Sequence, residues 1–127
     1  MKLHHLGIAT ANIEKTLDKY NKIYTITSIS DIIYDKIQDV DLCIFSTKEE
    51  TTFELVCGKK IENYINKGIE IYHLCYETDN FDMTLKQLSE KRLMMISNPE
   101  PAVLFNNRKV VFFYTPTGLI EILEKTK

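Results

Sequence analysis

Alternating apolar and polar residues open the chain. Residues 3–9 follow the two-residue period of a β-strand, which puts His5 and Gly7 on one face of that strand. The apolar spacing then changes to that of an amphipathic helix over residues 13–24, and Asn12 is placed to cap its N-terminus. Strands are expected in three further segments, 24–33, 41–46 and 51–56. The first half of the chain therefore has the order βαβββ.

The same order returns in the second half. A short helix over residues 61–67, stopped by Gly68, is expected to link the halves. Beyond it the pattern predicts a strand, a helix capped by Asp79 or Asn80, and three more strands, at residues 71–77, 81–91, 93–97, 110–114 and 119–124. We expect one α+β domain over residues 1–127, with modules at 1–58 and 69–127 and a linker at 59–68.

An internal repeat supports this division. The segment from His5 to Leu17 returns 68 residues later, and His, Leu, Thr, Asn, Thr and Leu recur in register. A second repeated motif, a Glu between two apolar residues, lies near the end of each half. It occurs at Glu54 and again 67 residues later at Glu121. The chain is therefore interpreted as a duplication in which each half opens on a histidine and closes on a glutamate.

The four repeated polar residues are the candidates for chemistry. Taken alone, a strand Glu such as Glu54 is more often solvent-facing, and a strand His such as His5 is more often a hydrogen-bonded core residue. An unpaired buried carboxylate costs several kcal/mol or more, so each Glu must face water, find a cation or stay protonated. The matching pair in the second half, His73 and Glu121, favours a common functional site over isolated structural residues.

Two imidazoles and two carboxylates are a charge-balanced set of ligands for one divalent ion. Such a set suits Co, Zn, Ni, Mn or Fe better than Ca or Mg. Four protein ligands leave two positions of an octahedron open for water or substrate, which is typical of a catalytic metal site. The hypothesis is a metal site made by His5, Glu54, His73 and Glu121.

Composition narrows the class of protein. The 127 residues are 44% apolar and carry a net charge of −2, which is typical of a soluble globular domain. A basic patch and a long apolar run are both missing from the sequence, so neither nucleic acid nor membrane is an expected partner. Three cysteines, Cys43, Cys57 and Cys75, without CxxC spacing favour free thiols in a cytoplasmic protein.

Four stretches carry a resemblance to a known family. The hexapeptide at residues 4–9, His-His-Leu-Gly-Ile-Ala, resembles the His-His-Ile-Gly-Ile-Ala opening of methylmalonyl-CoA epimerases, in which the second His binds metal. Residues 71–77, 53–55 and 119–124 resemble the segments that carry the other metal ligands. The chain is identified as a member of the vicinal oxygen chelate (glyoxalase/bleomycin resistance/dioxygenase) superfamily, most similar to the epimerases and next to glyoxalase I.

The resemblance implies a fold and a reaction. It implies two βαβββ modules that form a curved mixed sheet around the metal, an acyl-CoA or other thioester as substrate, and a homodimer. The implied reaction removes the proton α to the thioester carbonyl. Glu121 is the first candidate for the base. The epimerase motif Glu-x-Gln-Gly-Val is altered at residues 34–40, where its Glu falls on or beside Lys36, so Asp35 is the nearest candidate for a second base.

Three alternatives share the fold. A lactoylglutathione lyase of the glyoxalase I kind would use the same four ligands. An extradiol dioxygenase would use iron with two His and one Glu, which leaves Glu54 unneeded. A non-enzymatic antibiotic-binding or resistance module often lacks the ligands, so the presence of all four in this sequence argues against it.

Overall fold

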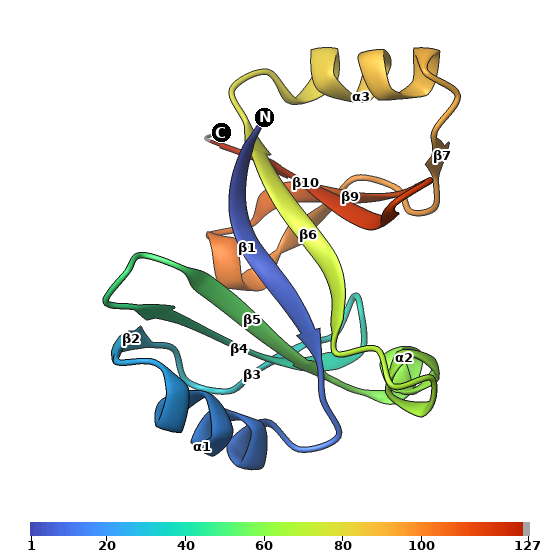
Figure 1. Cartoon of the computed structure of the whole chain (residues 1–127). Coiled ribbons are helices and arrows are strands. Elements are labelled where there is room, and N and C mark those ends of the chain that lie inside the picture. The colour runs from blue at the N-terminus through green and yellow to red at the C-terminus, as the bar shows by residue number, and fades with distance from the viewer. Residues whose placement is uncertain (126–127) are drawn as a thin grey trace. The chain divides into compact units, whose positions relative to one another are not determined.

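The computed structural model describes residues 1–125 (Figure 1), and the chain forms two compact units. The first unit is His5–Tyr72, and the second joins Met1–His4 to His73–Lys127. The second unit therefore takes up the first four residues of the chain. The division of the domain into modules at 1–58 and 69–127 stays a prediction.

The first unit is built on the order strand, helix, strands. Its elements are β1 (Lys2–Ala9) from His5 onward, α1 (Ile13–Ile23), β2 (Ile26–Ile29), β3 (Ile33–Asp35), β4 (Val40–Thr47) and β5 (Thr52–Cys57). The strands lie in the order β2-β4-β5-β1, with β3 also paired to β4. β1 runs parallel to β5, whereas β4 is antiparallel to β5, so the sheet is mixed.

Helix α1 covers one face of this sheet (Figure 1), and the core lies beneath it. Asn12 caps the helix as expected, because its side chain accepts a hydrogen bond of 3.0 Å from the amide of Lys15. Tyr20 packs its ring 5.0 Å from Phe53 and 5.5 Å from Phe45. Residues at alternate positions of β4 and β5 thus face α1, which leaves their neighbours on the opposite face.

The expected strand over residues 24–33 is divided in the structure. Ser30 donates its amide to the carbonyl of Ile44, and its hydroxyl accepts the amide of Ile44 at 2.9 Å. A side chain thus takes the place of a backbone partner, so β2 ends at Ile29 and β3 begins at Ile33. The expected linking helix is present as η1 (Lys59–Ile61) and α2 (Glu62–Asn66). The helix ends two residues before Gly68, whose φ of +73° is the left-handed conformation that glycine favours.

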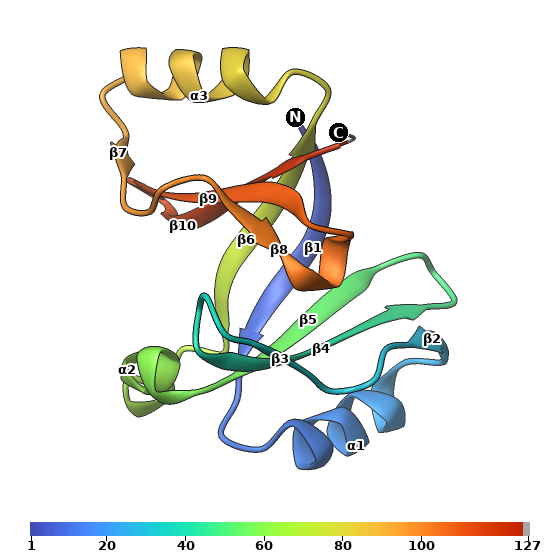
Figure 2. The same ribbon diagram turned by 180° about the vertical axis from the view of Figure 1, so that it is seen from behind.

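The second unit repeats the order of the first. Its elements are β6 (Ile71–Thr78), α3 (Phe81–Glu90), β7 (Met94–Met95), β8 (Glu100–Ala102), η2 (Val103–Phe105), β9 (Arg108–Thr115) and β10 (Gly118–Glu124). The strands lie in the order β6-β10-β9-β7, with β6 and β10 parallel. Figure 2 shows β8 leading through η2 into β9. Pro101 is tolerated in β8 because β8 pairs with β9 along one side.

The duplication extends to individual hydrogen bonds. The hydroxyls of Thr10 and Thr16 lie 2.6 Å apart, and those of Thr78 and Thr84, 68 positions later, lie 2.7 Å apart. Asn80 caps α3 as Asn12 caps α1, with a bond of 3.1 Å from the amide of Met83. The predicted α+β class and the mixed sheet are confirmed. Among the described residues, every helix is too short or too polar to cross a membrane.

Candidate metal centre

His5 and Glu54 form a buried pair in the first unit. Glu54 on β5 pairs with Gly7 on β1, and His5 lies two residues before Gly7 on the same strand face. Leu6 follows His5 and Leu55 follows Glu54 on their strands, and both belong to the core beneath α1, so the pair faces the other way. The Nε2 atom of His5 and the Oε1 atom of Glu54 are 3.6 Å apart, and their side chains are 0% and 6% exposed.

His73 and Glu121 form the same arrangement in the second unit. Glu121 on β10 pairs with Cys75 on β6, and His73 lies two residues before Cys75. The two atoms that approach, His73 Nε2 and Glu121 Oε1, are 3.3 Å apart, and their side chains are 1% and 3% exposed. The strand register of the two pairs is therefore identical, which makes them equivalent by structure as well as by sequence.

The spacing inside each pair suits two ligands of one cation. Two ligand atoms at about 2.1 Å from an ion lie about 3.0 Å apart at a right angle and about 3.4 Å apart at the tetrahedral angle. The observed 3.6 Å and 3.3 Å are close to that range and exceed the usual length of an N–H···O hydrogen bond, which is about 2.7–3.2 Å. Each pair thus offers one imidazole and one carboxylate that fit a transition-metal ion.

Asp35 is tied into a turn between β3 and β4. It is buried, and its Oδ1 atom accepts the amides of Ile37 at 2.9 Å and Gln38 at 3.2 Å. The Nε2 atom of Gln38 donates to the Oδ2 atom of Asp35 at 3.3 Å. Through these three hydrogen bonds the Asp35 carboxylate stabilises the turn. Its assignment as a second base stays a prediction.

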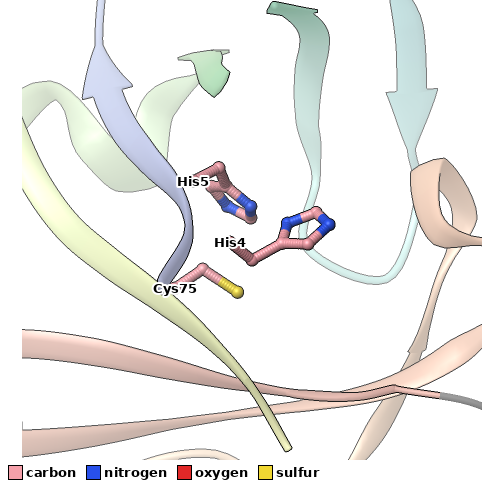
Figure 3. Close-up of side chains that lie close together, drawn as sticks. All are labelled: His4, His5 and Cys75. Atoms are coloured by element: carbon pink, nitrogen blue, oxygen red, sulfur yellow. The ribbon is translucent and has the colours of Figure 1, made fainter. Parts of the chain in front are cut away.

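His4 and Cys75 lie together in the second unit, and Figure 3 shows them as sticks with His5. Their candidate ligand atoms are within 4.8 Å of each other. The ring of His4 also packs edge-on against Phe105 of η2, with centroids 5.3 Å apart. Cys75 is fully buried.

An aromatic neighbour of His73 was missed by the sequence reasoning. Phe112 on β9 pairs with Glu121 and sets its ring edge-on to the His73 ring, with centroids 5.4 Å apart. Two adjacent Phe residues at 112–113 do not by themselves indicate which ring faces the histidine. The alternation along β9 could have indicated it, because Phe113 belongs to the core beneath α3 and Phe112 must face the other way.

Comparison with known proteins identifies relatives along most of the chain. Residues 4–112 match the family described as the Glyoxalase/Bleomycin resistance protein/Dioxygenase superfamily. The mitochondrial methylmalonyl-CoA epimerase of Dictyostelium discoideum is 29% identical over 133 aligned positions, which cover 98% of this chain and 78% of that protein.

Solved structures share the fold at lower identity. The methylmalonyl-CoA epimerase of Mycobacterium tuberculosis superimposes with a TM-score of 0.81 at 15% identity, over 99% of this chain and 89% of that one. A variant of the Streptomyces coelicolor methylmalonyl-CoA epimerase, solved in complex with 2-nitronate-propionyl-CoA, gives a TM-score of 0.75 at 13% identity, over 100% and 99% of the two chains. At these identities the likeness shows the fold.

Proposed function

Because the chain belongs to the glyoxalase/bleomycin resistance protein/dioxygenase superfamily, we propose that it is a metal-dependent epimerase. Its substrate would be an acyl-CoA with an exchangeable hydrogen α to the thioester carbonyl. The relatives support this assignment, since the Dictyostelium discoideum protein is named a methylmalonyl-CoA epimerase and matches 98% of the chain. The Streptomyces coelicolor enzyme was solved with an acyl-CoA analogue.

The single observation that carries the proposal is the repeated buried His–Glu pair. We propose that His5, Glu54, His73 and Glu121 bind one divalent ion together. One pair alone supplies two ligands, fewer than the three or four protein ligands typical of a zinc or related site. Two carboxylates also balance the charge of a divalent ion, which offsets the cost of burying them. Imidazole and carboxylate ligands fit Co, Zn, Ni, Mn or Fe.

The residues divide the work of the proposed reaction. A divalent ion bound there would act as a Lewis acid and stabilise the negative charge that develops on the carbonyl oxygen of the thioester. Glu121 is the first candidate to take the α-proton, since a positioned base contributes about 10²–10⁴-fold in rate. Epimerisation needs a second group on the opposite side of the carbon. Asp35 is the candidate, and it would have to give up part of its hydrogen bonding to the 37–38 turn.

Deuterium exchange tests the proposal. The metal-loaded protein is incubated in D₂O with one stereoisomer of methylmalonyl-CoA, and exchange is followed by mass spectrometry while a chiral assay follows the product. We expect exchange with inversion, its loss on chelation, and its return when Co²⁺ is added. The His73→Ala variant is expected to be inactive, whereas His4→Ala, one position from a proposed ligand, keeps most of the activity.

Two results would redirect the assignment. Turnover of the methylglyoxal–glutathione hemithioacetal without exchange into methylmalonyl-CoA would assign the lyase alternative. Metal-loaded protein that turns over neither compound would favour a binding module.

The same preparation also tests assembly, since we propose a homodimer that sedimentation would detect as a species of twice the chain mass. A cytoplasmic location stays a prediction from the cysteine content.

A further inference from the structure

A thiol and an imidazole lie close together in the second unit. His4 on β1 and Cys75 on β6 both belong to this unit, and their candidate ligand atoms are within 4.8 Å of each other. Figure 3 shows the two side chains close together. Neither residue belongs to the two His–Glu pairs, so the proposed metal centre does not include these two donors.

Cys75 differs in this respect from the other two cysteines. Among the described residues, the clusters of candidate metal ligands include Cys75 but neither Cys43 nor Cys57. The thiol of Cys43 donates instead to the backbone carbonyl of Ser30 at 3.5 Å. The pairing of a sulfur with a histidine nitrogen is therefore a property of one site, and the other cysteines supply a comparison within the same chain.

Both donors are held in place before any ion binds. The ring of His4 packs edge-on against the buried ring of Phe105, with centroids 5.3 Å apart. Cys75 is fully buried in β6, where it pairs with Glu121 of β10. Because neither side chain has to be ordered on binding, little conformational entropy is lost. His4 is only half-buried, so a small ion can reach the pair from its side.

The duplication shows that the fold does not require these donors. The equivalent positions, 68 residues away, are Gly7 for Cys75 and Tyr72 for His4. Both belong to the first unit, where the Tyr72 ring packs against Tyr64 with centroids 5.0 Å apart. The first unit thus folds the equivalent strands with a glycine and a tyrosine in these places, so neither a thiol nor an imidazole is needed to form them.

The donors select an ion by its charge and by its softness. A thiolate and a neutral imidazole together carry one negative charge, so a monovalent cation leaves the buried site neutral, whereas a divalent cation leaves one positive charge uncompensated. Thiolate sulfur also favours soft ions such as Cu⁺. With metal–sulfur and metal–nitrogen bonds of about 2.3 Å and about 2.0 Å, an ion in line between the two atoms places them about 4.3 Å apart. This separation lies inside the observed limit of 4.8 Å.

We propose that His4 and Cys75 bind one soft monovalent cation of the Cu⁺ class. When the ion binds, the Cys75 thiol releases its proton to solvent and the His4 imidazole stays neutral. The chain then has two sets of metal ligands with different preferences. The two His–Glu pairs suit a divalent ion, because two carboxylates balance its charge, and the thiolate with its imidazole suits a monovalent one.

Competition with a copper chelator tests the site. Co²⁺ is added first to fill the proposed divalent site, and the protein is then titrated without oxygen against the Cu⁺ complex of bathocuproine disulfonate, whose loss of colour measures the transfer of Cu⁺. We expect one Cu⁺ per chain. Cys75→Ser is expected to abolish this binding. His4→Phe is expected to weaken it at least about tenfold, because losing a direct ligand costs no less than losing a residue that supports one.

Matched variants separate coordination from packing. His4→Phe keeps an aromatic ring against Phe105 but offers no donor, whereas the thioether in His4→Met is itself a soft ligand. We therefore expect His4→Met to recover most of the Cu⁺ affinity that His4→Phe loses. Cys57→Ser is the control for the thiol, because Cys57 is half-buried and lies outside the ligand clusters found among the described residues. This variant is expected to bind Cu⁺ as the wild type does.

Three results would overturn the proposal. They are Cu⁺ binding that survives Cys75→Ser, Cu⁺ binding that is lost in Cys57→Ser, and a His4→Phe variant that binds Cu⁺ as tightly as the wild type. Circular dichroism checks that each variant is folded, and Cys75→Ala takes the place of Cys75→Ser if the buried hydroxyl unfolds the chain.

This site and the proposed function stand or fall separately. A protein that binds Cu⁺ through Cys75 and His4 but exchanges no thioester loses the epimerase assignment and keeps the Cu⁺ site. A protein that exchanges methylmalonyl-CoA but takes no Cu⁺ from the chelator keeps the epimerase assignment, and the Cu⁺ site is overturned.

Discussion

Replacing His5 and Glu54 together with apolar residues of similar size is expected to stabilise the metal-free protein. The change is His5→Leu/Glu54→Met. The His5 and Glu54 side chains are 0% and 6% exposed, so both polar groups are held out of water. Replacing a buried ionic pair with apolar residues of similar volume is often neutral or stabilising, by up to about 4 kcal/mol. If the pair exists to bind a metal, the metal-free wild type carries the free-energy cost of burying His5 and Glu54 without the stabilisation that a bound ion would supply.

The expected magnitude follows from the burial and the chain length. At about 2.1 cal/mol/K of unfolding entropy per residue, a chain of 127 residues changes its Tm by about 4 °C for each kcal/mol. A gain of about 1–4 kcal/mol therefore raises the Tm of the metal-free protein by about 4–15 °C. Metal at about 100 times its Kd adds about 2.7 kcal/mol to the wild type alone.

Thermal unfolding followed by circular dichroism, with chelator and then with Co²⁺, measures both effects. We expect the double variant to melt above the metal-free wild type and to show no response to Co²⁺. The equivalent variant of the second half, His73→Leu/Glu121→Met, is expected to behave alike. A metal-free double variant that melts well below the metal-free wild type would mean that the pair serves the fold, and the reasoning would be refuted.

Four further predictions test individual side chains. Glu121→Gln is expected to keep its bound metal but to lose at least about a hundredfold in the rate of deuterium exchange, which is the smallest typical contribution of a base. Asp35→Asn is expected to slow exchange from one stereoisomer more than from the other. Thr78→Val is expected to lower the free energy of unfolding, measured in urea, by about 1–3 kcal/mol, because it removes a hydrogen-bond partner of the buried Thr84 hydroxyl. The double variant Thr78→Val/Thr84→Val is expected to recover part of that loss. Burial raises the pKa of the Cys57 thiol, so less thiolate is present at pH 8, and iodoacetamide is expected to alkylate Cys57 more slowly than it alkylates free glutathione.

Local patterns predicted most of the fold. The alternation over residues 3–9, the helical spacing after Asn12 and the glycine at Gly68 each depend on a few neighbouring residues, and the structure confirms the strand, the capped helix and the helix stop. The His–Glu pairs were also within reach, because the repeat marked them and the two-residue period of a strand gave each side chain its face. The burial of Glu54 and Glu121 was not predicted from the pattern alone, because alternation also allows a Glu that faces solvent.

Features that depend on distant contacts could not be predicted in this way. Ser30 interrupts a strand only because its hydroxyl meets the amide of Ile44, fourteen residues on. The Ser46 and Thr52 hydroxyls form a pair only through the register of β4 against β5. The turn that holds Asp35 likewise needs the side chain of Gln38 to fold back. In each case a hydrogen bond made by a side chain, which leaves no periodic trace in the sequence, decides the outcome.

A calorimetric titration with Co²⁺ tests the central claim most directly. If the two His–Glu pairs hold one ion together, the wild type binds one Co²⁺ per chain, and both His5→Ala and His73→Ala weaken that binding severely while remaining folded. Two ions per chain, or one ion whose affinity is unchanged by the loss of either histidine, would contradict the account.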